Sequence, residues 1–495
     1  MTQEKSYKDT LNLPQTSFPM KANLAQREPE MLKAWEKDGV YPEIRKHAHG
    51  KPRYILHDGP PYANGHIHIG HALNKVLKDL IVKYQTMRGH DALYVPGWDC
   101  HGLPIEHACL KEMGKRKEEV DRVQFRKQAR KYAEKFIGTQ REEFKRLGIF
   151  GEWEKPYLTM NYEYQTAIAD SFLRLYEDGF IEQRLKPVPW CYDCETALAD
   201  AELEYQEEIA NSIYVKFQAN PQIYESLKNR KEELRGRKLF LLIWTTTPWT
   251  LPANVGAAFH PDLEYLFFEG MHNEVWLCEI SRVSHVFSGA PKELAKARGR
   301  ELAGFEYSHP FLKSRTGRTI CADYVSNEDG TGIVHIAPGH GEEDYQEGYL
   351  KNSLPILSPV NEKGQFTNDE RTGFVEVFPS FKNLNVLKGN KVNDEIKNIL
   401  RKNNLLLEPG IITAPYKHSY PHCWRCKKPI IFRATTQWFM KIDHKDLRKR
   451  MLKEIEKGIQ FIPDWGKNRI GAMVETRPEW RSEERRVGKE CRSRW

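Results

Sequence analysis

His68 and His71 stand three residues apart in residues 57–75, which read HDGPPYANGHIHIGHALNK. Two imidazoles at this spacing can donate hydrogen bonds to one anion, and Gly70 between them lets a nucleotide approach the backbone closely. A helix that begins here adds unpaired backbone N–H groups and a partial positive charge. The pattern therefore predicts a phosphate-binding corner, with a polar surface loop as the alternative.

Cysteine spacing indicates a metal site. Four of the nine cysteines form two Cys-x-x-Cys pairs, Cys191 with Cys194 and Cys423 with Cys426. Four thiolates can surround Zn²⁺ in a tetrahedron, which is the usual closed structural site. Cysteines of a cytoplasmic chain stay reduced, so metal binding is favoured over disulfides. A zinc ion would then join the two ends of the segment between the pairs, whereas two unrelated pairs are the alternative.

A strand, a loop and a helix are expected to position the histidines. Residues 54–56 read as a short buried strand, and the Gly, Pro and Asn of residues 59–65 break the chain into a tight loop. From Leu73 to Met87, apolar residues recur every three or four positions, which predicts a helix that stops at Gly89. A second apolar run follows at residues 92–95. The resulting βαβ unit predicts an α/β fold with a doubly wound, parallel, Rossmann-like sheet.

Asp99 directly follows the second expected strand. Parallel sheets bind ligands at the carboxyl ends of their strands, where a carboxylate can hold an amino group. A turn cap is the alternative. Further along, helical spacing in residues 115–185 predicts a pair of helices whose charges form a solvated face.

The chain between the cysteine pairs is rich in short runs typical of β-strands. Residues 238–243 read as a buried strand that leads into WTTTPWTLPAN at residues 244–254, and short β-like runs continue to about residue 380. The basic run at residues 292–300 is interpreted as a solvated helix rather than an RNA contact. We therefore expect an inserted β-rich domain, after which residues 430–439 form another strand of the parallel sheet.

The motifs GPPYANG, HIGH (residues 68–71) and GWDCHGLPIE (residues 97–106) together resemble a class I aminoacyl-tRNA synthetase of the bacterial isoleucyl type. The resemblance covers roughly residues 7–480. It implies a ligase that uses isoleucine, ATP with Mg²⁺ and the acceptor end of the isoleucine tRNA, with His68 and His71 stabilising charge on the phosphates. The implied ATP-binding residues are Pro61, Tyr62, Asn64, His68, Gly70 and His71. The implied isoleucine-binding residues are Gly59, Pro60 and Asp99, and the implied Zn²⁺ ligands are Cys191, Cys194, Cys423 and Cys426.

Two motifs of the insertion resemble a hydrolytic editing site, WTTTPWTLPAN and HIAPGHGEEDY (residues 335–345). One pocket discriminates poorly between valine and isoleucine, a limit for which isoleucyl enzymes are themselves the standard example, so a second site is needed. On this match Thr245, Thr246 and Thr247 lie near the ester and its attacking water. His335 shapes the site, and Asp344 holds the ammonium group. Without the resemblance, a Thr-rich edge strand and an acidic turn explain the same residues.

These observations predict five segments. Residues 1–50 form an N-terminal extension, residues 51–195 the first half of the catalytic domain, and residues 196–400 the inserted editing domain. Residues 401–480 return to the catalytic domain. Residues 481–495, RSEERRVGKECRSRW, resemble a translated sequencing adapter and are interpreted as non-native, with a basic RNA-binding tail as the alternative. The resemblance implies a lysine-rich ATP loop, the second half of the sheet and anticodon-binding helices beyond residue 495, so we expect an N-terminal fragment that does not aminoacylate.

The composition is typical of a soluble, globular protein. The 495 residues are 40% hydrophobic and 29% charged, and the net charge of +8 is compatible with an RNA partner without requiring one. No apolar run approaches membrane-spanning length and the start lacks a signal-peptide core, so we expect a cytoplasmic monomer without a membrane partner. Two other functions remain open: a non-catalytic zinc and RNA-binding module, and a tRNA deacylase that works through the insertion alone.

Overall fold

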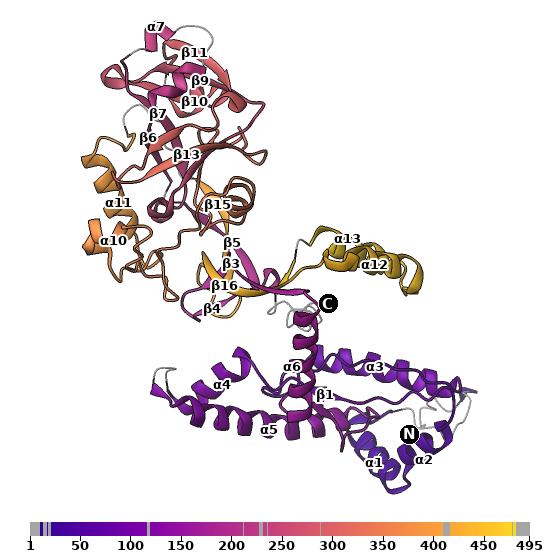
Figure 1. Cartoon of the computed structure of the whole chain (residues 1–495). Helices are drawn as coiled ribbons and strands as arrows, with labels where there is room; N and C mark the ends of the chain where they lie inside the picture. Colours follow the sequence, from indigo (N-terminus) through magenta and orange to yellow (C-terminus); the bar gives the residue numbers. More distant parts are fainter. Residues whose placement is uncertain are drawn as a thin grey trace, which may run out of the picture. The chain divides into compact units, whose positions relative to one another are not determined.

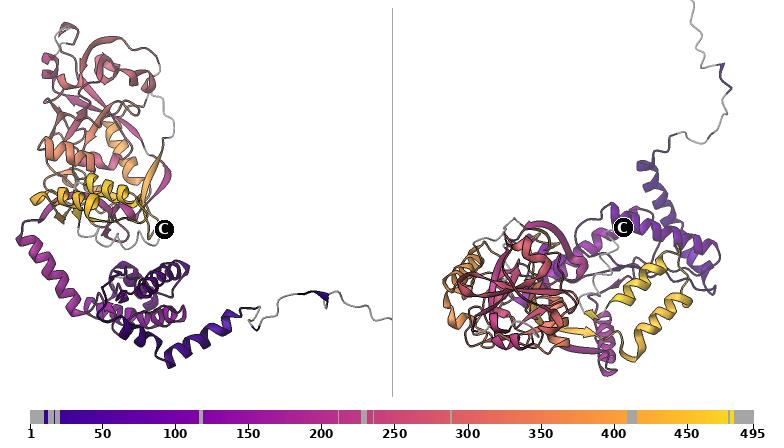
Figure 2. Two further views of the ribbon diagram at one scale, coloured as in Figure 1. Left: turned by 90° about the vertical axis from the view of Figure 1, so that its right-hand side faces the viewer. Right: turned by 90° about the horizontal axis from the view of Figure 1, so that it is seen from above.

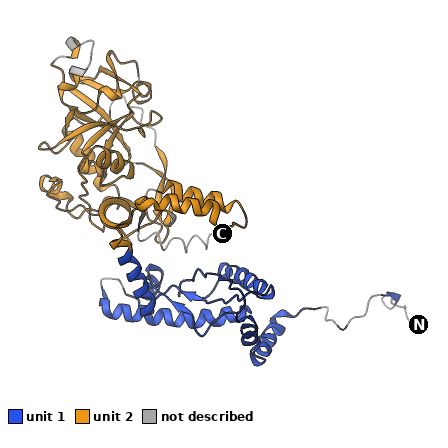
Figure 3. Ribbon diagram, turned by 45° about the vertical axis from the view of Figure 1, so that its right-hand side comes forward, with its two compact units in different colours: residues 1–174, 489–495 blue, residues 175–488 orange. Residues whose placement is uncertain are grey.

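The computed structural model describes residues 10–12, 17, 21–115, 119–210, 212–226, 231–234, 236–287, 289–408, 416–477 and 479–481. The chain separates into two compact units, the first reaching residue 174 and the second beginning at residue 175 (Figure 3). Among the described residues, no helix combines the length and apolar character needed to span a bilayer. The tail from residue 482 lies outside the described residues, and the predicted segment boundaries stay predictions.

The first unit combines short parallel strands with long helices (Figure 1). β1 (Gly97–Trp98) pairs in parallel with β2 (Tyr157–Leu158), and isolated parallel bridges join Arg53 to Asp91 and Tyr62 to Asp99. The predicted α/β class is confirmed, as is the helical pair in residues 115–185, which is α5 and α6. The helices are α1 (Leu24–Lys37), α2 (Val40–Ala48), α3 (Ile69–Met87), α4 (Leu103–Met113), α5 (Arg122–Arg146) and α6 (Tyr162–Glu177), the last of which runs into the second unit.

The strand predicted at residues 54–56 is not a buried strand. Ile55 is 78% exposed, whereas Tyr54 and Leu56 are partly buried against the core of this unit. Successive side chains of an extended segment point to opposite sides, so a core on one side buries only alternate residues. Residues 92–95 behave in the same way, with Ala92 and Tyr94 buried, and the parallel ladder itself forms further along, at β1.

Helix α3 confirms the predicted helix and its end, because Gly89 has a φ of +91°. Its apolar face is nevertheless turned away from the core. The buried residues of α3 are Lys75, Asp79 and Val82. In the part of the chain that the structure describes, the residues of the apolar face are all exposed, namely Ile69, Leu73, Val76, Leu77, Leu80, Ile81, Tyr84 and Met87.

The second unit contains the predicted β-rich insertion, a nine-stranded mixed sheet in the order β11-β9-β10-β7-β6-β12-β13-β8-β14 (Figure 1). The pairs β7–β10 and β8–β13 are parallel and the other neighbours are antiparallel. The buried strand predicted at residues 238–243 is confirmed as β7. The strands are β6 (Ile213–Ala219), β7 (Leu239–Thr245), β8 (Gly256–Phe259), β9 (Glu264–Glu269), β10 (Val275–Glu279), β11 (Glu293–Arg298), β12 (Glu306–Ser308), β13 (Thr316–Cys321) and β14 (Ile333–Ile336).

The basic run at residues 292–300 is a strand, so the prediction of a helix there is wrong. It forms β11, which pairs with β9 across a register shift between Glu293 and Ala295. Leu294 and Ala297 are buried, so this segment contributes to the core like any other strand. β11 lies at the edge of the sheet, where charged side chains oppose pairing with another chain.

Two small antiparallel sheets, β17-β16-β3-β4 and β15-β5, together called the ribbon here, join the two ends of the insertion. β3 (Ile181–Cys191) pairs with β16 (Ile431–Met440), and β5 (Leu203–Ile209) pairs with β15 (Lys417–Cys423). The strand predicted at residues 430–439 therefore exists, but it belongs to this ribbon and not to the parallel sheet. Helices α12 (Leu447–Lys453) and α13 (Gly466–Thr476) lie side by side after the ribbon (Figure 2). The remaining elements of this unit are β4 (Thr196–Ala197), α7 (Lys231–Leu234), α8 (Val283–Val286), α9 (Glu342–Asp344), α10 (Phe374–Val377), α11 (Lys391–Lys402) and β17 (Trp480–Arg481).

Candidate functional site

The two histidines cap the start of helix α3. His68 is the N-cap residue, and its Nδ1 accepts a hydrogen bond from the Gly70 N–H at 3.1 Å. His71 reaches back, and its Nδ1 accepts from the His68 N–H at 3.3 Å. The two rings stack with their centroids 3.9 Å apart. This capping box satisfies two backbone N–H groups at the start of the helix, which is where the sequence predicts a phosphate site.

Both imidazoles present a protonated Nε2 atom to an incoming ligand. In a neutral imidazole one nitrogen accepts and the other donates, so rings that accept through Nδ1 carry their proton on Nε2. Burial, together with His68 and Lys75, lowers the pKa of His71 to about 4, so this ring is neutral near pH 7. The corner thus offers Nε2–H donors next to the positive end of α3.

Gly70 has a role that the sequence does not reveal. A Cβ atom at this position would lie 3.0 Å from His68 Cε1 and 3.1 Å from His68 Nδ1. The absent side chain therefore makes room for the His68 ring of the capping box. Close approach of a nucleotide to Gly70 stays a prediction.

The loop that carries the other predicted residues pairs with the segment around Asp99. The Asp99 N–H donates to the Pro61 carbonyl at 2.8 Å, and the Ala63 N–H donates to the Asp99 carbonyl at 2.9 Å. These bonds bring the loop that contains Gly59 and Pro60 next to Asp99, and isoleucine binding by these three residues stays a prediction. The Asp99 side chain is buried and accepts from the Thr159 hydroxyl at 3.3 Å, so it already has a partner within the protein.

The Asn64 side chain stabilises this loop through two hydrogen bonds. Its Nδ2 donates to the Pro104 carbonyl at 3.3 Å, and its Oδ1 accepts from the Tyr132 hydroxyl at 2.8 Å. Both ends of the amide are therefore held by the protein. A contact of Asn64 or of Tyr62 with ATP stays a prediction.

Helix α5 holds residues 62–67 in place through hydrogen bonds of two residues that the sequence analysis missed. Gln140 is fully buried, and its Nε2 donates to the carbonyls of Tyr62 at 3.2 Å and Gly65 at 2.9 Å. Glu143 accepts from the Ile67 N–H at 2.9 Å. The charges of this helix are thus not only a solvated face. Gln140 was detectable, since it is a polar residue on the buried face that also contains Ala133, Ile137 and Phe144.

Asp58 connects the three pieces of this corner and was also missed. Its buried carboxylate accepts from Lys75 Nζ at 2.6 Å, from Lys78 Nζ, and from the Gly97 N–H at 3.3 Å. Lys75 also donates to the Tyr94 hydroxyl at 2.6 Å. Burial opposes ionisation of Asp58, but Lys75 and Lys78 hold the pKa of its carboxyl below the ordinary value. One buried carboxylate therefore fixes the loop, α3 and the segment before Asp99 against one another.

The four predicted metal ligands meet in the second unit. The sulfur atoms of Cys191, Cys194, Cys423 and Cys426 all lie within 4.8 Å of one another, and Cys191 Sγ is 3.5 Å from Cys426 Sγ. Zn–S bonds of about 2.3 Å in a tetrahedron place sulfurs about 3.8 Å apart, so the donor set fits Zn²⁺. Hydrogen bonds from the Cys191 and Cys194 thiols lower the pKa of the Cys423 thiol, whereas the pKa values of the Cys191 and Cys194 thiols are raised, so without a metal the cluster favours one thiolate among neutral thiols.

The two cysteine turns have matching backbones. Cys191 ends β3 and Cys423 ends β15, and each pair is followed by a non-glycine residue with positive φ, Glu195 at 50° and Lys427 at 59°. The Cys194 N–H points at Cys191 Sγ at 3.3 Å. Two similar turns from opposite ends of the insertion therefore present one set of four sulfur donors.

In the insertion, the predicted threonines lie next to His335. Thr245 ends β7, and its Oγ1 accepts from the Thr247 N–H at 3.1 Å. Thr250, which the prediction did not include, lies 3.1 Å from His335 Nε2 through its Oγ1. His335 is buried on β14, and burial lowers its pKa to about 4. Thr250 Oγ1 also donates to the Thr247 carbonyl at 2.8 Å, so Thr250 connects Thr247 with His335.

Asp344 contacts the residue that directly follows β14. Its Oδ2 accepts from the Ala337 N–H at 2.8 Å, and its Oδ1 accepts from the Tyr324 hydroxyl at 3.1 Å. Burial raises the pKa of its carboxyl to about 6, so the group is still mainly ionised near pH 7. Among the described residues, no hydrogen bond connects Asp344 directly to the threonines, and its contact with an ammonium group stays a prediction.

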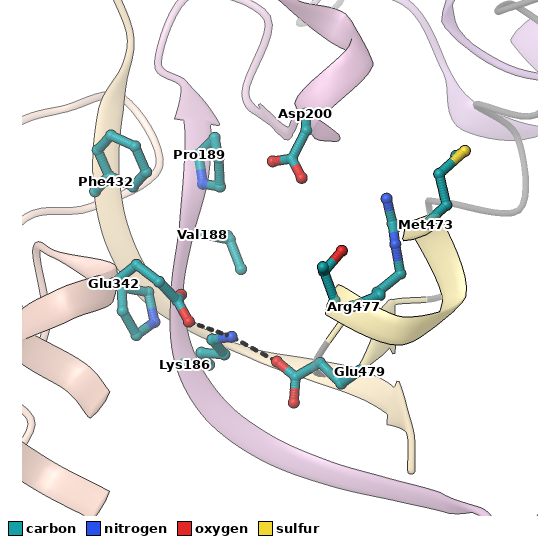
Figure 4. Close-up of a pocket in the computed structure, with 11 residues that line it drawn as sticks. Lys186, Val188, Pro189, Asp200, Glu342, Phe432, Met473, Arg477 and Glu479 are labelled. Atoms are coloured by element: carbon teal, nitrogen blue, oxygen red, sulfur yellow. Dashed lines mark hydrogen bonds and ion pairs between the residues drawn. The ribbon is translucent and has the colours of Figure 1, made fainter. Parts of the chain in front are cut away.

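The second editing-like motif is attached to the ribbon. The Gly339 carbonyl accepts from the Ala434 N–H at 2.8 Å, and His340 Nδ1 lies 2.8 Å from the Phe432 carbonyl. Glu342 pairs with Lys186 on β3 at 2.7 Å. Lys186 also pairs with Glu479 at 2.5 Å, at one wall of a pocket of about 390 Å³ (Figure 4). The loop after β14 and the ribbon of the zinc site are therefore joined directly.

Comparisons with known proteins agree with these motifs. The family described as tRNA synthetases class I (I, L, M and V) matches residues 30–491. The isoleucine–tRNA ligase of Thermotoga petrophila is 49% identical over 486 residues, covering 97% of this chain and 49% of that protein. The isoleucine–tRNA ligase of Geobacter sulfurreducens is 46% identical over 477 residues, covering 96% of this chain and 49% of that protein. The chain thus spans about half the length of the curated relatives it matches.

A solved structure shows a weaker likeness. The ternary complex of an Agrobacterium radiobacter K84 leucyl enzyme, LeuRS-tRNA-LeuAMS, covers 68% of this chain and 44% of its own chain at 17% identity. The TM-score is 0.33, which is too low to support an argument about the fold.

Proposed function

Because the chain belongs to the class I tRNA synthetases of the isoleucine, leucine, methionine and valine group, we propose that it acts in the ATP-dependent attachment of isoleucine to its tRNA. The relatives named as isoleucine–tRNA ligases support the choice of amino acid. The capping box of α3 is the observation that carries the proposal for ATP, since it leaves neutral imidazoles with Nε2–H donors at a helix start.

In this reaction an isoleucine carboxylate oxygen attacks the α-phosphorus of ATP, and pyrophosphate leaves with the electrons of the broken P–O bond. Negative charge builds on the phosphate oxygens as the new bond forms. His68 and His71 would donate to these oxygens from one side, and Mg²⁺ that accompanies ATP would neutralise part of the charge. Asp99 would hold the isoleucine ammonium group. The Cys191, Cys194, Cys423 and Cys426 sulfurs would hold Zn²⁺, which here has a structural role.

Binding of ATP tests this assignment in the chain as it is. Replacing both His68 and His71 by Ala should weaken ATP binding by about tenfold or more, because two hydrogen bonds to charged oxygens are lost. The control is His47→Ala, which changes an exposed histidine of α2. Equal ATP affinity of the double variant and the unchanged chain would remove both histidines from the site.

We also propose that this chain alone binds ATP without isoleucine-dependent pyrophosphate exchange. In this proposal the imidazoles would contact the phosphates from one side only, so most of the stabilisation of the transition state would not be made. Exchange at a rate near that of a complete ligase would contradict this. If the chain shows no exchange, no ATP binding and no deacylation, the non-catalytic zinc and RNA-binding module is favoured.

The residues around the ends of β7 and β14 favour a second activity. This activity is hydrolysis of the ester in an isoleucine tRNA that carries valine (Val-tRNA). Water attacks the ester carbonyl, the ester C–O bond breaks, and valine leaves while the terminal ribose regains its hydroxyl. Thr245, Thr246 and Thr247 would surround the ester, and Asp344 would hold the ammonium group of valine. The polar contacts of Thr245, His335 and Asp344 support this arrangement.

Release of valine from charged tRNA tests the second activity. Asp344→Ala leaves the ammonium group without its ion partner, which should cost on the order of 2–5 kcal/mol of binding if the pair is buried. Asp394→Ala, which changes an exposed residue of α11, is the matched control. Equal release by the Asp344→Ala variant and the unchanged chain would remove Asp344 from the mechanism, and no release by either would reject the hydrolytic activity.

A further inference from the structure

The first half of helix α5 carries basic residues that no acidic residue of the same segment balances. Residues 122–133, RVQFRKQARKYA, contain five basic residues and no acidic one. Among the described residues, Arg130 is the one of these five that forms an ion pair, with Glu134 at 3.3 Å. The other four are exposed and have no carboxylate partner in the described part of the chain, namely Arg122, Arg126, Lys127 and Lys131.

The second half of α5 has the usual pattern of a solvated charged face. Residues 134–146 contain three acidic and four basic residues. Each of these four basic residues forms an ion pair, namely Lys135 with Glu112, Arg141 and Lys145 with Glu154, and Arg146 with Glu28. Mixed charge signs of this kind are typical of an exposed helix. The unpaired positive charge is therefore confined to the first half of α5.

The basic residues do not stabilise the start of the helix. The N-terminal end of a helix carries a partial positive charge, so cations in its first turns are unfavourable and acidic residues are favoured. The first turn of α5 has no acidic residue, and the N-cap Asp121 accepts from the Gln124 N–H at 2.9 Å. Positive charge that is collected against this preference favours an anionic partner for the surface.

The spacing of the basic residues arranges them in two rows. Arg122, Arg126 and Arg130 follow at intervals of four residues, as do Lys127 and Lys131, so each set lies along one side of the helix. Both α5 and the start of α6 belong to the first unit (Figure 3).

An exposed aromatic ring lies at the end of the arginine row. Tyr162 is the first residue of α6 and is 73% exposed. Arg130 Cζ lies 5.6 Å from the centre of the Tyr162 ring. Basic side chains bind the phosphates of a nucleic acid, and an exposed aromatic ring stacks with an unpaired base. The two features together are typical of a surface that binds a single strand.

Arg130 also connects this surface to the segment beside Asp99. Its Nη1 donates to the Met160 carbonyl at 3.4 Å. Met160 directly follows Thr159, whose hydroxyl donates to the Asp99 carboxylate at 3.3 Å. A strand that runs along the arginine row to Tyr162 therefore comes to the segment that supports the proposed isoleucine site.

We propose that this surface binds an unpaired strand of RNA, with the basic side chains on the phosphates and the Tyr162 ring against one base. The surface consists of Arg122, Arg126, Lys127, Arg130, Lys131 and Tyr162. The choice of the acceptor end of a tRNA as this strand rests on the proposed function, in which that end has to reach the activated isoleucine. Phosphate and stacking contacts carry no sequence information, so the surface accepts strands of different sequence.

The phosphate contacts are tested by binding of uncharged isoleucine tRNA to the whole chain at several salt concentrations. Each contact with a single strand contributes about 0.7 to the slope of log affinity against log salt concentration. K127Q/K131Q removes two contacts, so the slope should become shallower by about 1.4. K33Q/K37Q changes two exposed lysines at the same spacing in α1, and this matched control should keep the slope of the unchanged chain.

The stacking contact is tested by substitution of Tyr162. Y162A should weaken tRNA binding about fivefold or more, as expected for one lost base stack, whereas Y162F keeps the ring and should bind as the unchanged chain does. Y84A is the control, because Tyr84 is 53% exposed and Arg88 Cζ lies 5.7 Å from its ring centre, but α3 has no basic rows of this kind. Y84A should leave the affinity unchanged.

Competition distinguishes RNA from an acidic protein as the partner. Polyglutamate has negative charge but no bases, so it should displace the tRNA less effectively than a single-stranded RNA of the same total charge. Equal displacement by the two competitors would overturn RNA as the partner.

Three other results would overturn the proposal: an unchanged slope for K127Q/K131Q, equal affinity of Y162A and the unchanged chain, and no binding of tRNA by the unchanged chain. ATP binding is measured separately from all of them. A chain that binds ATP but not tRNA would reject this surface and keep the proposed ATP site. A chain that binds tRNA through this surface but not ATP would reject the ATP site alone.

Discussion

The Asp58 carboxylate lies 2.6 Å from Lys75 Nζ, and the side chains of both residues are at most 3% exposed. Lys75 follows the histidine corner by one turn of α3, and Asp58 immediately precedes the loop with Gly59 and Pro60. The same carboxylate accepts from the Gly97 N–H two residues before Asp99. This ion pair is therefore the direct link between the elements that carry the proposed ATP and isoleucine sites.

Asp58→Asn should destabilise the first unit by about 3–5 kcal/mol, because it leaves Lys75 charged and buried without its partner. The pKa of the Asp58 carboxyl is lowered, so the unfolded chain takes up this proton at a higher pH than the folded chain. The contribution of Asp58 is therefore present above the unfolded pKa and is lost as the pH falls through the folded one. Thermal unfolding followed in both variants measures the change, with Asp38→Asn in an exposed position as the control.

Zinc should be present at about one ion per chain, because four cysteine sulfurs form one closed donor set. Cys423→Ser should lower the zinc content and the unfolding temperature together, since metal binding contributes directly to folding. Metal analysis after removal of loosely bound ions gives the content, and Cys321→Ser, outside this donor set, is the control. Unchanged zinc in the Cys423→Ser variant would show that the metal is bound elsewhere.

Because the apolar face of α3 is exposed, substitutions on it should hardly change the free energy of unfolding. Leu80 is 58% exposed, so Leu80→Lys should change the free energy of unfolding by less than about 0.5 kcal/mol. Val82 lies on the buried side of the same helix, and Val82→Ala should cost about 1–2 kcal/mol for two lost methyl groups. Denaturant unfolding compares the two variants. A large loss for Leu80→Lys would mean that this face is covered in solution.

The buried groups near the end of β14 predict how the stability of the second unit depends on pH. His335 and His340 have pKa values lowered to about 4, so between pH 6.5 and 4 the unfolded chain binds more protons. Stability from these groups falls as the pH decreases through this range. Asp344 acts in the opposite direction, because its pKa is raised to about 6 and the folded chain binds its proton first.

Asp344→Asn should therefore make the loss of stability between pH 6.5 and 4 steeper, because the opposing contribution is removed. Calorimetric unfolding at several pH values measures the slope. Asp394→Asn, which changes an exposed carboxylate, should leave the slope as it is. A shallower slope in the Asp344→Asn variant would contradict the raised pKa of Asp344.

The sequence by itself determined those features whose signal is local. The apolar spacing from Leu73 to Met87 and the stop at Gly89 predict α3, because a helical face and a helix end are formed by residues a few positions apart. An apolar run rich in β-formers predicts β7, and each Cys-x-x-Cys spacing predicts one half of the donor set. Each of these depends on neighbours along the chain, so residue type and spacing are sufficient.

Tertiary structure alone decided which side of each element faces the core and which polar groups meet. Periodicity shows that α3 has an apolar face, but not that the core takes Val82 from the other side. The basic run at residues 292–300 became strand β11 because Leu294 and Ala297 fill the core beside β9. Thr250 and His335 are 85 residues apart, and their contact exists only in the folded chain. Such hydrogen bonds depend on distance in space, and no spacing along the chain encodes them.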